Sequence, residues 1–189
     1  MTQDQAIDVV DQLLQDHVEV RSLFTAFETA RTAEERSDVF RHIVHDLSVH
    51  ETAEEEVVWP VVRTDLAEGA ALADVRIGEE EAANRLMAKL EALDFDGREF
   101  SSVFEDCRRA VLSHAEREEN DVFPLLRQLD PGKLAPMATL VDAAKKAAPT
   151  HPHPHVPGTA TANLLAGPAA AIVDRTRDSL RKARERLSR

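Results

Sequence analysis

The chain is poor in the residues that build disulfide-rich, tyrosine-ligated or membrane-spanning proteins. Its 189 residues include one cysteine (Cys107), no tyrosine, 6 glycines and 4% aromatic residues. A single cysteine excludes an internal disulfide and a C-x-x-C zinc or redox motif. The N-terminus lacks the basic and apolar regions of a signal peptide, and no run of about 18 apolar residues is present. The sequence therefore predicts a globular cytoplasmic protein without a transmembrane segment.

Charge is divided unevenly along the chain, whose net charge is -12. Residues 1–130 contain 13 Lys and Arg against 31 Asp and Glu, a net charge of -18, whereas residues 131–189 contain 10 against 4, a net charge of +6. An acidic body repels the phosphates of nucleic acid. We therefore expect the main domain to bind no DNA or RNA, while the basic end suits an acidic partner or the acidic body itself.

The spacing of apolar residues predicts helix over most of the first 147 residues. Low glycine content and frequent Ala, Leu, Glu and Arg favour helix as well. The expected helices span about 4–30, 33–59, 72–93, 98–123 and 132–147. Proline lacks an amide proton, so Pro60 and Pro124 should interrupt or end the second and fourth helices. These features predict an all-α fold, an antiparallel up-down-up-down four-helix bundle with a C-terminal helical extension.

Changes in composition divide the chain into four parts. A bundle over 1–130 is followed by an additional helix over 131–148, a Pro- and His-rich linker over 149–167 and a basic amphipathic helix over 168–189. The last segment carries seven Lys and Arg around a weakly apolar face. This helix either docks on the acidic bundle or binds a protein partner or a membrane surface.

An internal repeat carries the strongest functional signal. Residues 50–60 (HETAEEEVVWP) align without a gap with residues 114–124 (HAEREENDVFP), at an offset of 64 residues. Both copies contain H-x-x-x-E-E and end in an aromatic residue followed by proline. The same offset brings His17 opposite Glu81, so the bundle is predicted to consist of two similar helical hairpins.

The repeated His and Glu continue apolar stripes and should therefore point into the bundle core. A buried carboxylate needs a partner, and a metal ion is a natural one. Spacings of 33 residues, from His17 to His50 and from Glu81 to His114, bring the polar positions of all four helices to one height. We infer a site of three His and three Glu, made by His17, His50, Glu54, Glu81, His114 and Glu118.

Six side chains, three of them carboxylates, exceed what one tetrahedral zinc ion takes, so we expect two cations. Mixed imidazole and carboxylate ligands suit iron or manganese. Glu54 and Glu118, each one turn beyond a histidine, are the candidates to bridge the two ions. Candidates to orient a ligating imidazole through its other nitrogen are Asp16, Asn84 and Asp121. The alternative is a metal-free bundle in which core His and Glu form hydrogen-bonded pairs.

At these residues the sequence resembles the haemerythrin-like HHE cation-binding family, a four-helix bundle with a non-haem diiron site. The resemblance covers roughly residues 8–128 and rests on the motif H-x-x-x-E-E-x-x-x-aromatic-Pro, present twice. It implies two non-haem iron ions joined by an oxo or hydroxo bridge, with manganese or zinc as substitutes. The family ligands carry over onto His17, His50, Glu54, His114 and Glu118. The third helix departs from the family pattern, because it has Glu81 where the family usually supplies histidine.

A carboxylate in place of a neutral imidazole favours ferric iron and lowers the potential of the site. The resemblance therefore implies a small diatomic or peroxide ligand, O2, H2O2 or NO, and redox chemistry rather than reversible oxygen storage. Peroxide-decomposing or oxidase-like activity is one form of this chemistry. An alternative function is an iron- or oxygen-responsive regulatory module that acts through the tail after Pro149, and a third is iron handling of the ferritin type. An alternative site has Glu81 facing outward, with Glu80 or water in its place.

Overall fold

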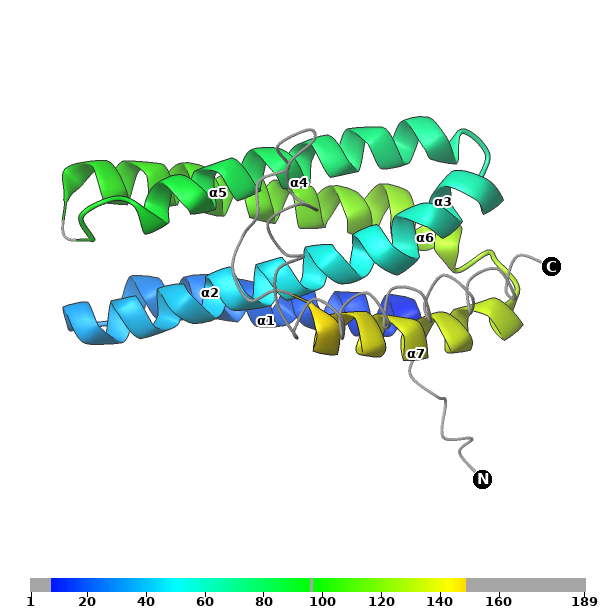
Figure 1. Ribbon diagram of the computed structural model, residues 1–189, viewed down its shortest axis with the longest axis horizontal. Coiled ribbons are helices and arrows are strands. Elements are labelled where there is room, and N and C mark those ends of the chain that lie inside the picture. The colour runs from blue at the N-terminus through cyan, green and yellow to red at the C-terminus, as the bar shows by residue number, and fades with distance from the viewer. Residues whose placement is uncertain (1–7, 96, 149–189) are drawn as a thin grey trace, which may run out of the picture.

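The computed structural model describes residues 8–95 and 97–148, and these form helices without any strand (Figure 1). The four long helices are α1 (Val9–Thr29), α2 (Ala33–Ala53), α4 (Gly69–Glu91) and α5 (Arg98–Arg117). Helix α7 (Pro131–Ala147) packs against α1 and α2, while α4 pairs with α5 on the other side. The predicted all-α bundle is confirmed. The predicted linker over 149–167 and basic helix over 168–189 lie outside the described residues. No helix of the described part is long and apolar enough to cross a membrane.

Local sequence sets where these helices begin. Asp8 caps α1 by accepting a hydrogen bond from the amide of Asp11, and Thr32 caps α2 in the same way from Glu35. Such caps are each worth about 1 kcal/mol. Before α4, Glu68 has a φ of 56°, and a side chain added at the next residue, Gly69, would collide with the carbonyl oxygen of Val62. The tight turn into α4 therefore requires glycine at position 69.

Each copy of the repeated motif contains a π-helical turn at the same place. The segments η1 (Glu54–Val58) and η2 (Glu118–Val122) precede α3 (Trp59–Asp65) and α6 (Phe123–Leu126). The amide of Trp59 bonds to the carbonyl of Glu54, five residues earlier, and Phe123 bonds to Glu118 likewise. The prolines that follow cannot donate a backbone hydrogen bond, and the chain passes through them by widening one turn. The prolines thus interrupt the α-helices without ending the helical path.

Two apolar clusters occupy the two ends of the bundle. One contains Val10, Leu13 and Trp59 together with the apolar face of α7. The other is rich in phenylalanine, with the rings of Phe27 and Phe104 stacked at 3.9 Å between centroids, and it also buries Cys107. Along α1, Leu13 belongs to the first cluster and Val20 to the second, so His17 falls between them. The polar centre of the protein is therefore enclosed by apolar packing at both ends.

Candidate metal centre

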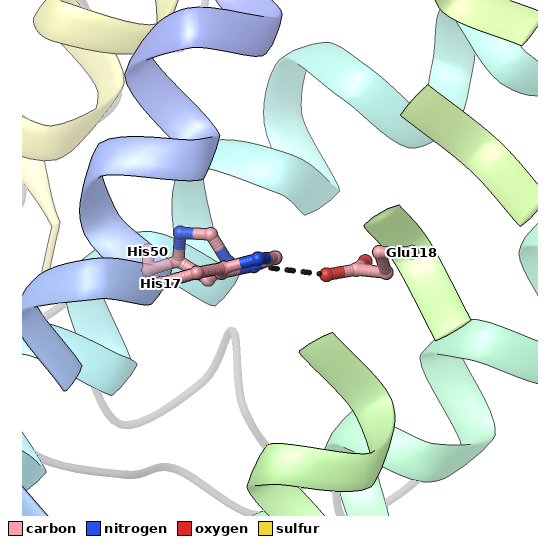
Figure 2. Close-up of side chains that lie close together, drawn as sticks. All are labelled: His17, His50 and Glu118. Atoms are coloured by element: carbon pink, nitrogen blue, oxygen red, sulfur yellow. Dashed lines mark ion pairs between the residues drawn. The ribbon is translucent and has the colours of Figure 1, made fainter. Parts of the chain in front are cut away.

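Three buried histidines each present one ring nitrogen to the centre of the bundle. His17 from α1, His50 from α2 and His114 from α5 are 4%, 5% and 8% exposed. Their Nε2 atoms form no hydrogen bond within the described residues. The Nε2 atoms of His17 and His114 lie 3.3 Å from different oxygens of Glu118, and His50 Nε2 lies 3.3 Å from Glu54. Figure 2 shows His17 and His50 on one side of the centre and Glu118 facing them from the other.

Three buried glutamates complete the centre. Glu54 and Glu118 are fully buried, and Glu80 on α4 is 2% exposed. Both oxygens of Glu54 and of Glu118, and Oε2 of Glu80, have no hydrogen-bond donor in the part of the chain that the structure describes. Leaving buried carboxylates and imidazole nitrogens without partners is costly unless another group satisfies them. These orphaned atoms are the donor types that iron and manganese accept, so the centre fits metal cations.

The candidate ligand atoms fall into two overlapping sets. One set consists of His17, His50 and Glu118, and the other of Glu54, Glu80, His114 and Glu118, with all atoms of a set within 4.8 Å of one another. Glu118 belongs to both sets, and its two oxygens face different histidines. The geometry can therefore hold two cations with Glu118 between them.

Burial and mutual repulsion perturb the carboxylates strongly. Burial raises the pKa of Glu54 well above its ordinary value, and the negative charges of Glu118 and Glu80 raise it further. Burial raises the pKa of Glu80 as well, and the Glu51 charge adds to this shift. Burial acts in the same direction on Glu118, but the neighbouring imidazoles of His114, His17 and His50 together outweigh it and lower the Glu118 pKa to about 2. Without cations, protons on Glu54 and Glu80 relieve the repulsion, and a metal ion would displace them.

Each histidine donates a hydrogen bond from its other ring nitrogen, Nδ1, to a carboxylate. Each of these carboxylates is itself paired with a cationic side chain. The Nδ1-to-oxygen distances are 2.9, 2.9 and 3.1 Å for His17, His50 and His114. An ionised carboxylate only accepts hydrogen bonds, so each Nδ1 carries a proton. In the neutral imidazole the Nε2 lone pair then faces the centre and can bind a cation. The three contact chains are His17–Glu119–Arg21, His50–Asp16–Lys145 and His114–Glu79–Arg117.

The third long helix contributes Glu80 to the centre instead of the expected Glu81. The Glu81 side chain is 40% exposed, and its carboxylate lies 3.7 Å from Arg85. The offset of 64 residues relates α2 to α5, but α1 corresponds to α4 at 63 residues, because Asp16–His17 match Glu79–Glu80. One residue turns a helical side chain by about 100°. The prediction that Glu81 lies in the site is therefore wrong, and Glu80 takes its position.

The supporting residues also differ in part from those expected. Asp16 bonds to His50 as predicted. Asn84 instead donates to the buried carboxylate of Glu51, and Asp121 is exposed, so neither orients a histidine. Sequence reasoning missed Glu51, Glu79 and Glu119. The second glutamate of the H-x-x-x-E-E motif was a usable signal for Glu119, but nothing local distinguished Glu79 from its neighbours.

A small and mostly apolar cavity adjoins the three histidines. Its wall includes Val20, Leu47 and Val111 as well as Glu51 and Glu80. Glu51 is 8% exposed, and burial raises its pKa to about 8 despite the hydrogen bond from Asn84. The cavity can admit a small uncharged molecule to the edge of the centre.

Known proteins share these features. Residues 8–126 match the family described as Hemerythrin HHE cation binding domain. An uncharacterized hemerythrin-like protein of Schizosaccharomyces pombe is 25% identical over 176 residues, 92% of this chain and 87% of that protein. A DNA nickase of Nostoc sp. is 29% identical over 142 residues, which span 75% of this chain but 40% of the nickase.

A solved structure shares the fold. The crystal structure of a hemerythrin HHE cation binding domain-containing protein from Mycobacterium kansasii superposes with a TM-score of 0.66 at 16% identity, over 90% of this chain and 99% of that one. The family match spans well over half of the chain and contains all six central residues. The chain therefore belongs to the hemerythrin HHE cation-binding domain family.

Proposed function

We propose that the chain holds two non-haem iron ions in this centre and reacts with O2, H2O2 or NO. The observation that carries the proposal is Glu118, one of whose oxygens lies 3.3 Å from His17 Nε2 and the other 3.3 Å from His114 Nε2. A carboxylate so placed would be a ligand that two cations share. Three imidazoles and three carboxylates suit iron, with manganese as a substitute and zinc as a poorer one.

Redox chemistry is favoured over reversible storage by the carboxylate of Glu80. When bound, the iron pair supplies the electrons that reduce O2, peroxide or NO. Glu80 adds negative charge and a hard oxygen donor to the set of Glu54, His114 and Glu118, which stabilises the more oxidised metal. The sequence predicts this lowering of the potential for a carboxylate at Glu81, and in the structure the carboxylate of Glu80 lies there instead.

The cavity provides the access that such a reaction needs. Its mostly apolar surface suits a small uncharged ligand. Glu51 lies in this wall and, with a pKa of about 8, holds a proton on its carboxyl group at neutral pH in the metal-free centre. The hydrogen bond from Asn84 keeps this carboxyl group in place.

DNA nicking, the activity named for the Nostoc relative, is not part of the proposed function. Residues 1–130 carry a net charge of -18, which repels a phosphate backbone. The proposed ligand is a small molecule, and the proposed compartment is the cytoplasm, where a thiol such as Cys107 remains reduced.

Elemental analysis of protein produced with iron, combined with optical spectra before and after addition of peroxide, tests the proposal. We expect about two iron ions per chain, as the two ligand sets imply, and an absorption band that responds to peroxide. The variant Glu80→His should form a longer-lived complex with oxygen than the parent, while Glu81→His should behave as the parent does. A parent protein that remains iron-free after reconstitution would reject the proposal.

A further inference from the structure

Helix α7 lies outside residues 8–126, the part of the chain that matches the family, and yet it contacts the metal centre. Lys145 Nζ lies 2.5 Å from both carboxylate oxygens of Asp16. Asp16 Oδ2 in turn accepts the hydrogen bond from His50 Nδ1, at 2.9 Å. A continuous chain of polar contacts therefore runs from α7 to an imidazole whose Nε2 faces the centre.

Apolar packing fixes the position from which Lys145 reaches Asp16. Met137, Val141 and Ala144 of α7 are at most 2% exposed and belong to the apolar cluster that contains Trp59. At the other end of α7, Lys133 Nζ lies 2.7 Å from Asp65 Oδ2. Contacts therefore hold the helix along its length. Lys145 directly follows Ala144, the last buried residue of α7.

The support of His50 differs from that of the other two histidines. The cation behind His17 is Arg21 on α1, and those behind His114 are Arg117 on α5 and the buried Arg76 on α4. All three arginines belong to the long helices of the bundle itself. Lys145 is 22% exposed and comes from the additional helix, so the orientation of His50 depends on the docking of α7.

We propose that Lys145 is a positioning residue of the metal centre. By holding Asp16, it keeps the His50 proton on Nδ1 and leaves the Nε2 lone pair directed at the cation. Helix α7 is then an integral part of the centre, although it lies outside the matched family domain. The expected effect on metal binding rests on the proposed function. The orientation of the His50 imidazole does not.

The surroundings of Asp16 explain why the ammonium group is needed. Asp16, Glu19, Asp46 and Lys145 line one open groove that ends at His50. With Lys145 removed, three carboxylates share this groove, and their repulsion and hydration draw Asp16 away from the histidine. The imidazole then loses the hydrogen bond that selects its tautomer.

Three variants of the full chain test the proposal. Lys145→Met keeps most of the aliphatic stem and removes the charge, and Lys145→Arg restores a charge on the same helix. Lys133→Met is the matched control, because it removes a lysine–aspartate contact between α7 and the bundle at a distance from the centre.

The first measurement is the tautomer of His50 in the metal-free protein, from long-range 1H–15N correlations of the imidazole. We expect the proton on Nδ1 in the parent, in Lys145→Arg and in Lys133→Met, and a mixture of tautomers in Lys145→Met. The second measurement is the rate of iron loss to a chelator. We expect loss about tenfold faster in Lys145→Met, the lower end of the effect of groups that support a metal ligand.

An unchanged His50 tautomer in Lys145→Met, or iron loss no faster than in Lys133→Met, would overturn the proposal. Equal effects of the two variants would show that α7 contributes packing alone. If the parent protein takes up no iron, the proposed function fails, and the tautomer measurement still decides whether Lys145 positions His50.

Discussion

Replacement of Glu80 by glutamine should change the stability of the metal-free and metal-loaded proteins in opposite directions. Glu80 is 2% exposed, Trp59 Nε1 donates to its Oε1 at 2.7 Å, and its Oε2 has no partner among the described residues. Burial raises the pKa of Glu80 well above its ordinary value. A raised pKa in the folded state means that the carboxyl group favours folding at low pH, and that this contribution is lost as pH rises.

Glutamine keeps the shape of the side chain and the acceptor for Trp59 but does not ionise. Above neutral pH the parent must take up a proton or bury a charge at Glu80 when it folds, and the variant need not. Metal-free Glu80→Gln should therefore be more stable than the parent by roughly 1–3 kcal/mol, which is one to two pH units of linkage at about 1.4 kcal/mol each. In the metal-loaded protein, the variant lacks one charged donor from the set of Glu54, Glu80, His114 and Glu118. We expect this variant to bind metal 10- to 100-fold more weakly, so the stabilisation by metal falls by about 1.4–2.8 kcal/mol relative to the parent.

Urea unfolding at pH 8, with excess metal and with excess chelator, measures both effects. The control variant is Glu81→Gln, whose carboxylate is 40% exposed and 3.7 Å from Arg85. An exposed pair of this kind contributes less than about 1 kcal/mol, so this variant should match the parent in both conditions. If Glu81→Gln reduced the stabilisation by metal and Glu80→Gln did not, the assignment of Glu80 to the centre would be refuted.

Three further predictions concern the centre and the core. His114→Ala should lose most of the bound metal and the stabilisation that the metal adds. Elemental analysis and thermal unfolding with and without metal measure the two effects. Full metal content in this variant would show that His114 is not a ligand. The Glu51 pKa is raised from 4.5 to about 8, so the free energy of unfolding of the metal-free protein should fall as pH rises across this interval, by up to about 1.4 kcal/mol per pH unit. Glu51→Gln should flatten this dependence in urea titrations, and an unchanged slope would contradict the assignment. Met87→Ala, at a fully buried position, should cost about 2–5 kcal/mol with metal content unchanged, whereas Val75→Ala, at a 53% exposed position, should cost less than about 0.5 kcal/mol.

The helical fold and most of the centre follow from local sequence. Apolar residues three and four positions apart predict a face of a helix whatever it packs against, and the Thr32 cap and the repeated H-x-x-x-E motif are readable without tertiary information. His50 with Glu54 and His114 with Glu118 are such pairs, four residues apart on one helix. His17 continues the apolar stripe of α1. These five residues were therefore predictable, and the structure brings them together.

Only tertiary structure decided which of the consecutive residues Glu79, Glu80 and Glu81 enters the centre. All three are acidic, so the side chains themselves do not rank them, and successive positions on a helix differ by about 100° in direction. The burial of Ala83, Met87 and Leu90 sets the rotation of α4, and this rotation turns Glu80 inward. The contact between Lys145 and Asp16 joins residues 129 positions apart. No local pattern encodes such a contact, because it exists only when the apolar face of α7 is packed on the bundle.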